Sequence, residues 1–292
     1  MPSSLINRDL ISINDLTKNE ILFILQLAKD LKAKPQPTLL QNKVLASLFF
    51  EPSTRTRLSF ETAMERLGGR VIGFADKDVT SASKGETLYD SIRIIGQYAD
   101  VIAMRHPLEG SARRAAEATD KPILNGGDGA NQHPTQTLLD LFTIQETQKK
   151  LTGLSIALAG DLKYGRTVHS LMQALLHFSP HYLEELKKNK IKFSLHEKME
   201  EVIKQADIFY LTRIQKERFA DSMDYERVKN VFRLTLAHLI GVKKNLKILH
   251  PLPRVNELDD KIDTTSHAYY FQQAENGLYV RQALLGAVLG KI

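Results

Sequence analysis

Six short apolar runs in this chain each end in a cluster of polar and cationic residues. This repetition is typical of an α/β sheet, because ligands bind beyond the carboxyl ends of parallel strands, where the strands deliver their side chains. We therefore expect the clusters to face a common site. The six runs are residues 44–50, 101–104, 122–124, 154–159, 208–211 and 246–249.

The length of 292 residues is enough for two ordinary domains, each with its own core. Strand and helix patterns alternate on both sides of a strong helix pattern at 135–147. We predict an α/β fold of two similar domains, each a parallel sheet flanked by helices, with the active site in the crevice between them. The first domain is expected at 1–134 and the second at 135–277, with a C-terminal helix at 278–292 packing back on the first.

Local signals predict further elements along the chain. Apolar residues at helical spacing indicate helices over 15–34 and 54–67, the first stopped by two prolines and the second by two glycines. A small, polar, Gly-containing stretch at 79–86 predicts a mobile loop before another helix at 87–98. The cluster after the first strand therefore lies at the start of a helix.

Composition excludes several classes of protein. The hydrophobic content of 42% and charged content of 25% match a globular chain, and no apolar stretch is long enough to span a bilayer. The absence of cysteine excludes disulfides, thiolate metal sites and a cysteine nucleophile. With no export signal at the N-terminus, we expect a cytoplasmic protein without a membrane partner.

The net charge of +6 raises the question of a nucleic-acid partner. Basic residues are interspersed with acidic ones, and the short lysine runs have no aromatic residues between them, so we expect no nucleic acid. Arginines at strand ends are more informative, because they favour anionic ligands.

The first cluster has the composition of an anion site. Ser53-Thr54-Arg55-Thr56 at a helix start can offer backbone N–H groups, hydroxyls and a cation to one phosphate. An ordinary helix cap needs only a single Ser or Thr. The added cations of Arg55 and Arg57 favour the phosphate interpretation.

Arg105 and His133 follow two other predicted strands. Each alone could be structural, as an ion-pair partner or a hydrogen-bonded core histidine. Together they could polarise one carbonyl group.

Several common cofactor and catalytic motifs are missing from the sequence. Residues 160–166 follow a strand and open a helix, but the Gly-x-Gly-x-x-Gly pattern of a dinucleotide loop is missing and Arg166 at the helix start suits a carboxylate. A Walker loop, an acidic metal cluster and a Gly-x-Ser-x-Gly elbow are also missing from the sequence. Metal catalysis and covalent hydrolysis therefore have no support.

Three motifs in fixed order, residues 53–57, 133–136 and 250–254, carry a specific resemblance. With them the chain resembles the carbamoyltransferases over nearly its whole length. Residues 161–166 and 212–218, with His-Pro-Leu-Pro at 250–253, resemble the catalytic chains that act on aspartate. Ornithine-specific members usually carry a cysteine in the last motif, and Asp-Ser-Met in this chain echoes their ornithine motif only in a different local context.

The resemblance implies a site for carbamoyl phosphate and L-aspartate that needs no metal or organic cofactor. It implies that the phosphate is held by Ser53, Thr54, Arg55 and Thr56, and that the carbonyl oxygen meets Thr56, Arg105 and His133. Gln136 and the backbone of Pro251 and Leu252 would hold the carbamoyl amide. Arg166 would bind one aspartate carboxylate, and Arg213 and Gln215 the other.

The resemblance also implies a homotrimer with active sites shared between adjacent chains. Each site would borrow Lys84 and a serine, Ser81 or its rival Ser83, from the neighbouring chain. Glu51 is expected to pair with Arg166 and Arg218 when the domains close. A regulatory chain or a dihydroorotase partner is left open.

One departure from the family pattern lies at 178–183, where the chain passes from helix to helix and about one strand of the second sheet is missing. The expected reaction is carbamoyl transfer to aspartate in pyrimidine biosynthesis. Two alternatives are a carbamoyltransferase for another amino acid and a catalytically silent homologue that acts as a scaffold.

Overall fold

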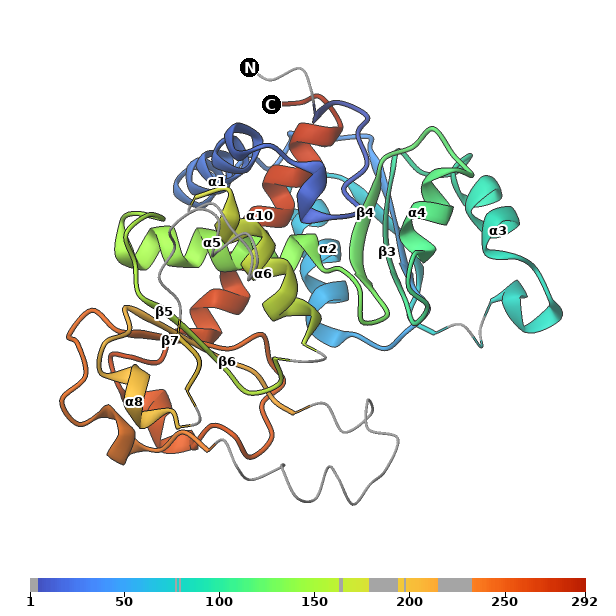
Figure 1. The fold of residues 1–292 in the computed structure, drawn as a ribbon. Coiled ribbons are helices and arrows are strands. Elements are labelled where there is room, and N and C mark those ends of the chain that lie inside the picture. The colour runs from blue at the N-terminus through green and yellow to red at the C-terminus, as the bar shows by residue number, and fades with distance from the viewer. Residues whose placement is uncertain are drawn as a thin grey trace. The chain divides into compact units, whose positions relative to one another are not determined.

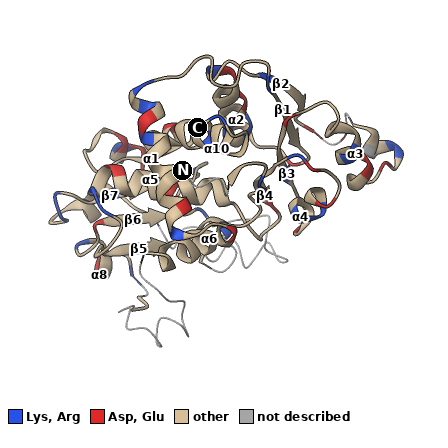
Figure 2. Ribbon diagram, turned by 90° about the horizontal axis from the view of Figure 1, so that it is seen from above, with Lys and Arg blue, Asp and Glu red and all other residues tan. Residues whose placement is uncertain are grey.

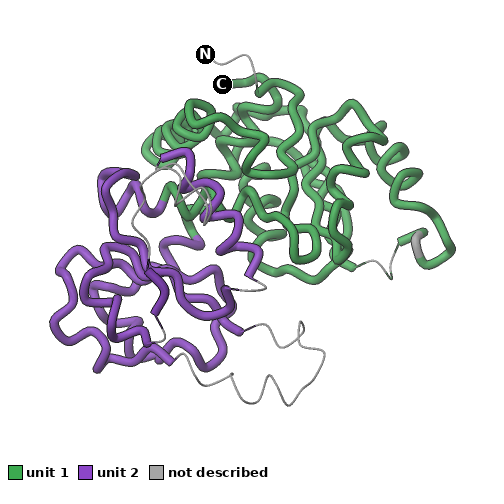
Figure 3. The backbone as a smooth tube through the Cα atoms, in the orientation of Figure 1, with its two compact units in different colours: residues 1–142, 275–292 green, residues 143–274 purple. Residues whose placement is uncertain are grey.

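The computed structural model of this protein describes residues 5–76, 78, 80–162, 165–178, 194–196, 198–214 and 233–292. The chain divides into two compact units, residues 1–142 with 275–292, and residues 143–274 (Figure 3). Each unit contains a parallel sheet flanked by helices, which confirms the predicted fold class. The sequence-based boundary at 134/135 falls at the start of α5 (Pro134–Gln148), and the one at 277/278 falls inside α10 (Tyr270–Val288).

The sheet of the first unit has the order β2-β1-β3-β4, with all neighbours parallel. Alternate residues of β1 and β3, such as Leu48 and Met104, pack into a core with α3 and α4. The other face of β1 meets α2, where Ser47 donates a hydrogen bond to Glu61. Figure 1 shows α3 and α4 on one side of this sheet and α2 on the other. The strands are β1 (Val44–Phe49), β2 (Arg70–Phe74), β3 (Val101–His106) and β4 (Ile123–Asp128).

Strand β2 was not expected from the sequence. It lies at the edge of the sheet with partly or fully exposed side chains, so its residues show no buried apolar run. Gly73 adopts a φ of +148°, and a Cβ there would lie 1.9 Å from the Ser47 carbonyl oxygen. The glycine that obscures the strand in the sequence is what allows it to approach β1.

The helices of the first unit follow local capping signals where these are strong. Helix α1 begins after Thr17, whose hydroxyl accepts from the Glu20 N–H while the Glu20 carboxylate accepts from the Thr17 N–H, a capping box. Helix α4 was missed, because it has only six residues and a glycine at its N-cap. The first-unit helices before α5 are α1 (Lys18–Ala33), α2 (Thr54–Arg66), α3 (Leu88–Ile95) and α4 (Ser111–Ala116), with short 3-10 turns η2 (Ile13–Asp15) and η4 (Ser81–Lys84).

The sheet of the second unit has the order β5-β6-β7, again parallel. Its middle strand is buried along its whole length, as expected for a strand covered on both faces. The predicted loss of a strand near 178–183 falls almost entirely outside the described residues. The elements are β5 (Ile156–Ala159), α6 (Arg166–Leu176), α8 (Glu200–Ile203), β6 (Ile208–Leu211), η6 (Leu236–Leu239), β7 (Lys247–Leu249) and η7 (Asp260–Thr264).

Two properties of the described residues concern possible partners. Figure 2 shows lysines and arginines interspersed with acidic residues over the described ribbon. Among the described helices, none is both long and apolar enough to cross a membrane.

Candidate active site

The start of α2 keeps the properties of an anion site. Ser53 is the N-cap residue, and its side chain makes no capping hydrogen bond. The first turn contains no acidic residue, so no side-chain charge there neutralises the positive end of the helix dipole. Arg57 Nη1 lies 3.8 Å from Oε1 of Glu61, one turn further along the same helix. The unused Ser53 cap and the uncompensated helix start leave this end of α2 suited to an anionic group.

Thr56 and Arg105 meet at Gly126 in β4. Thr56 is buried in the first turn of α2, and a Cβ at Gly126 would lie 3.3 Å from its Cγ2. Arg105 Nη1 donates a long hydrogen bond of 3.5 Å to the Gly126 carbonyl oxygen. The start of α2 and the end of β3 thus bring the Thr56 side chain, through its methyl group, and the Arg105 guanidinium to one glycine of β4.

The register of β3 decides which way Arg105 faces. Arg105 pairs with Phe49, so its side chain lies on the α2 face of the sheet. Its Nη2 donates to Glu51 Oε1 at 3.2 Å. Its Nε is buried and makes no hydrogen bond within the described part of the chain. The guanidinium therefore retains donor capacity for a ligand.

A buried carboxylate shapes the turn from β4 into α5. Asp128 accepts hydrogen bonds from Asn125 Nδ2, the Gln132 N–H, the Gly110 N–H and Asn131 Nδ2, at 2.9–3.1 Å. This network fixes the chain just before His133, which is buried next to the first residue of α5. Sequence reasoning missed Asp128, although an acidic residue in a Gly-rich turn was its signal.

The 3-10 turn η4 contains Ser81 and Lys84, both exposed. It packs against α3. Ser83 Oγ donates to the Thr80 carbonyl oxygen at 2.7 Å, which engages that hydroxyl within the turn. The expected mobile loop therefore contains a turn with local hydrogen bonds.

In the second unit, the expected aspartate ligands follow the carboxyl edge of the sheet. The Asp161 N–H donates to Thr212 Oγ1 at 3.0 Å, which joins the ends of β5 and β6. Arg166 is the first residue of α6, and Arg213 is the second residue after β6. Gln215 lies outside the described residues, as does Arg218. The structure thus places two arginines after neighbouring strands.

The loop after β7 is held by a buried histidine. His250 Nδ1 accepts from the Leu252 N–H at 2.8 Å, so Nε2 carries the proton that is donated to Glu257 Oε1, also at 2.8 Å. Burial alone would raise the pKa of Glu257, but hydrogen bonds from His250 and the Val255 N–H hold it below its ordinary value of 4.5. Leu252 has a φ of +51°, an uncommon conformation for a non-glycine residue. The bonds at His250 support this backbone next to Pro251.

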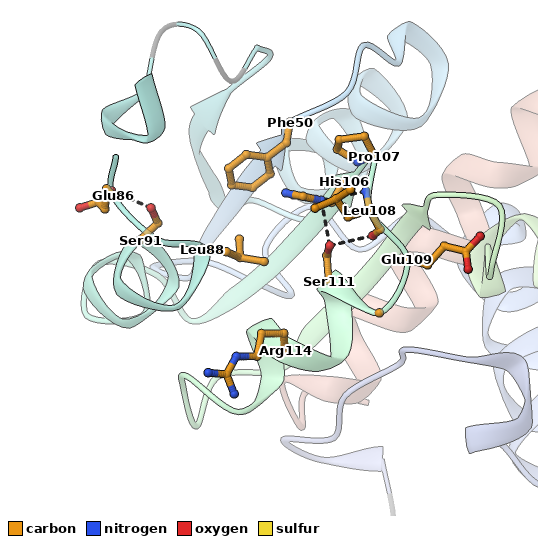
Figure 4. A pocket seen from close by; sticks show the side chains of 11 residues that line it. Phe50, Glu86, Leu88, Ser91, His106, Pro107, Leu108, Glu109, Ser111 and Arg114 are labelled. Carbon is orange, nitrogen blue, oxygen red and sulfur yellow. Dashed lines mark hydrogen bonds between the residues drawn. The ribbon is translucent and has the colours of Figure 1, made fainter. Parts of the chain in front are cut away.

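A pocket of about 680 Å³ opens on the opposite face of the first sheet (Figure 4). It is lined by residues from the ends of β1 and β3 and the starts of α3 and α4, and by none of the predicted site residues. His106 lies beside the Phe50 ring, with centroids 5.0 Å apart, and its Nδ1 accepts from the Leu108 N–H. Burial lowers the pKa of His106, although Glu51 and Asp128 oppose the shift. The groups of this pocket are engaged in local structure.

Family models match both halves of the chain. Residues 8–146 match the carbamoyl-P binding domain of aspartate/ornithine carbamoyltransferases, and residues 152–288 match the Asp/Orn binding domain. The chain belongs to the aspartate/ornithine carbamoyltransferase family. Within the described residues, this carbamoyltransferase contains no group of three or more His, Asp or Glu side chains that could hold a metal ion.

Several relatives resemble this carbamoyltransferase over nearly its whole length. The aspartate carbamoyltransferase catalytic subunit of Bacteroides fragilis is 56% identical, with 97% of each chain covered. That of Vibrio campbellii is 55% identical, covering 100% of this chain and 99% of the relative. The latter alignment spans 308 positions against 292 residues here, so the relative contains segments that this chain lacks.

Solved structures of the same family are similar in fold. Aspartate transcarbamoylase from Trypanosoma cruzi in complex with carbamoyl phosphate and aspartate has a TM-score of 0.92 at 36% identity, with 98% of each chain covered. The catalytic subunit of M. Jannaschii aspartate transcarbamoylase has a TM-score of 0.88 at 46% identity, covering 97% of this chain and 98% of that one.

Proposed function

We propose that this chain transfers the carbamoyl group of carbamoyl phosphate to the amino group of L-aspartate, giving N-carbamoyl-L-aspartate and phosphate. The observation that carries the proposal is the meeting of Thr56 and Arg105 at Gly126, beside the uncompensated start of α2. A hydroxyl and a guanidinium next to an anion site suit an acyl phosphate. The aspartate carbamoyltransferase relatives at 55–56% identity support the same reaction.

The first substrate uses the first unit. Its phosphate binds Ser53, Thr54, Arg55 and Thr56, where the helix dipole favours negative charge. Its carbonyl oxygen accepts from Thr56, Arg105 and His133. The buried Nε and the long Gly126 bond of Arg105 support this role, because they leave the guanidinium free to strengthen its bonds as charge develops on that oxygen.

The second substrate uses the second unit. Arg166 binds one carboxylate of aspartate, and Arg213 with Gln215 binds the other. Two guanidiniums for two carboxylates fix orientation as well as charge, because each fork can bind a carboxylate through two parallel bonds. The position of both arginines after neighbouring parallel strands supports this assignment.

The reaction needs positioning and electrostatic stabilisation but no cofactor. The aspartate nitrogen forms a bond to the carbonyl carbon, and the carbonyl electrons move onto the oxygen. The carbon–oxygen bond to phosphate then breaks, and the departing phosphate accepts the proton of the amine. Gln136 and the backbone of Pro251 and Leu252 hold the carbamoyl NH₂ throughout.

The proposal includes a homotrimer with sites shared between adjacent chains, and two domains at 1–134 with 278–292 and at 135–277. Side chains three apart in a 3-10 turn eclipse each other, so Ser81 and Lys84 project from one side of η4. Ser83 is engaged with Thr80. Both observations favour Ser81 over Ser83 as the borrowed serine. Glu51 exchanges Arg105 for Arg166 and Arg218 when the domains close.

The proposal places the chain in cytoplasmic pyrimidine biosynthesis, with a regulatory chain or a dihydroorotase as candidate partners. The words "catalytic subunit" in the names of the relatives support a regulatory partner.

A phosphate-release assay tests the function. The purified chain is given carbamoyl phosphate with aspartate, with ornithine or with no acceptor. Of these three reactions, only the one with aspartate is expected to release phosphate. Release with ornithine would assign a different acceptor, and no release with any amino acid would support a silent scaffold.

A further inference from the structure

The amide of Gln136 is oriented by a buried carboxylate one turn along α5. Gln136 Nε2 donates a hydrogen bond to Asp140 Oδ1 at 2.9 Å. Asp140 is fully buried, and Gln136 is 9% exposed. An ionised carboxylate can only accept hydrogen bonds, so the amide nitrogen of Gln136 must face Asp140. The amide oxygen consequently points the other way.

The buried cation of Arg281 interacts electrostatically with Asp140. Arg281 of α10 is 3% exposed, with its guanidinium 4.9 Å from the centre of the Phe60 ring, and its Nη2 donates to Thr135 Oγ1 at 3.4 Å. A Cβ on Gly277 would lie 2.4 Å from Arg281 Nη1, so this path of the side chain requires a glycine.

The cation and the carboxylate support each other's charge. Burial lowers the pKa of Arg281 to about 9, and the charge of Asp140 opposes that shift. Arg281 and the Asp140 carboxylate therefore attract each other. An ionised carboxylate is acceptor-only, which is the property that orients Gln136.

We propose that Asp140, supported by Arg281, is a positioning residue that presents the Gln136 oxygen to the NH₂ of the carbamoyl group and so makes the site selective for carbamoyl over acetyl phosphate. This inference rests on the proposed function, in which Gln136 holds the carbamoyl amide. Acetyl phosphate has a methyl group in place of the NH₂ and would leave the oriented oxygen without a donor.

Binding of the two acyl phosphates, measured by calorimetry without aspartate, tests the proposal. The wild-type chain should bind carbamoyl phosphate at least about tenfold more tightly than acetyl phosphate. In Asp140→Asn the new amide can donate to the Gln136 oxygen, and the Gln136 amide is then free to turn its nitrogen outward. The preference should fall by roughly tenfold, mostly through weaker carbamoyl phosphate binding. A purely structural role would weaken both ligands equally.

Three further variants make the test decisive. Gln136→Leu should lose the same preference, and Asp140→Asn added to it should change the preference no further. Asp207→Asn is the matched control, since it removes a half-buried carboxylate bonded to Lys243 in the other unit and should leave the preference unchanged. If Asp140→Asn does not fold, Gln136→Leu still decides the role of the oxygen.

The outcomes separate this inference from the function. Wild-type preference retained in folded Asp140→Asn or in Gln136→Leu would overturn the inference while carbamoyl transfer stands. A wild-type chain that neither binds carbamoyl phosphate nor releases phosphate would overturn the proposed function itself.

Discussion

Replacing Arg105 by alanine should lower turnover about a hundredfold to a thousandfold. The side chain is 13% exposed, with one bond of 3.2 Å to Glu51, one of 3.5 Å to Gly126 and a buried Nε without a partner among the described residues. It is thus a preorganised donor whose capacity is only partly used. Loss of one such donor to a developing oxyanion costs about 2.7–4 kcal/mol of transition-state stabilisation, which gives the predicted factor.

The same substitution should change stability much less. The Glu51 side chain is 31% exposed, and although its Oε2 is buried without a hydrogen bond among the described residues, water that enters the space of the removed Arg105 side chain can solvate Oε1. A pair with that access to water contributes about 0–1 kcal/mol, and the bond to Gly126 lies at the long limit. The backbone ladder between β1 and β3 is unaffected. We therefore expect a decrease of at most about 1 kcal/mol in the free energy of unfolding.

Steady-state turnover at saturating substrates and urea unfolding of the same samples measure the two effects. Arg114→Ala is the control, because its side chain is 62% exposed on α4, where it pairs with Glu117 and lies over the Tyr89 ring. Arg105→Lys should recover part of the turnover, since it keeps the charge without the fork. Near-normal turnover of Arg105→Ala at saturation would refute the reasoning, as would a loss fully explained by unfolded protein.

The remaining predictions concern the shared site, the second substrate, the half-buried His106 and the buried Glu257. Lys84→Ala and Arg105→Ala proteins should each be nearly inactive, yet an equal mixture reassembled from dissociated chains should recover about a quarter of wild-type activity. About three quarters of randomly assembled trimers are hybrids, and each hybrid has one intact site in three. If native mass spectrometry detects the hybrids but no activity returns, the shared site is ruled out. Arg213→Ala should lower kcat/KM for aspartate by an amount equivalent to about 2–5 kcal/mol, while calorimetry finds carbamoyl phosphate binding unchanged. Loss of carbamoyl phosphate binding with unchanged aspartate kinetics would remove Arg213 from the aspartate site. Because the pKa of His106 is lowered in the folded state, the wild type should lose stability as the pH falls below 6.5. His106→Asn keeps an acceptor for the Leu108 N–H but cannot take up a proton in this range, so its loss of stability should be smaller. Urea unfolding at several pH values measures both losses, and equal losses would contradict the prediction. The low pKa of Glu257 contributes stability that is present above pH 4.5 and lost below it. Glu257→Gln should therefore be less stable than the wild type at neutral pH, and the difference in free energy of unfolding should become smaller in acid. A difference that does not depend on pH would contradict this prediction.

Much of the fold could be predicted because its signals are local. The runs that became β1 and β3 are buried on both faces, and α1 begins at a capping box that the sequence spells out. Strand β2 and helix α4 escaped prediction because an edge strand has no continuous apolar run and six helical residues show less than two turns of periodicity. The expected domain boundary at 134/135 followed the start of α5, whereas the compact units divide inside that helix.

The candidate site could be predicted only as far as it follows strand ends. Each cluster after a strand is visible in the sequence, and Thr56 and Arg105 come together because parallel strands end at one edge. The supporting groups are different. Asp140 and Arg281 lie far apart in the chain, and their relation depends on how α10 packs against α5, for which no local pattern exists. Burial, not spacing, reveals these two residues.

The end of β3 shows how register assigns roles that the sequence leaves open. Arg105 and His106 are adjacent and both polar, so the motif alone does not say which one faces the substrates. Pairing of Arg105 with Phe49 turns it to the α2 face, and alternation then sends His106 to the opposite face, against Phe50. There its Nδ1 is used by the turn into α4. Substitution at Arg105 should consequently act on turnover and substitution at His106 on stability. If His106→Asn lowered turnover as strongly as Arg105→Ala without changing stability, this assignment of the two faces would be wrong.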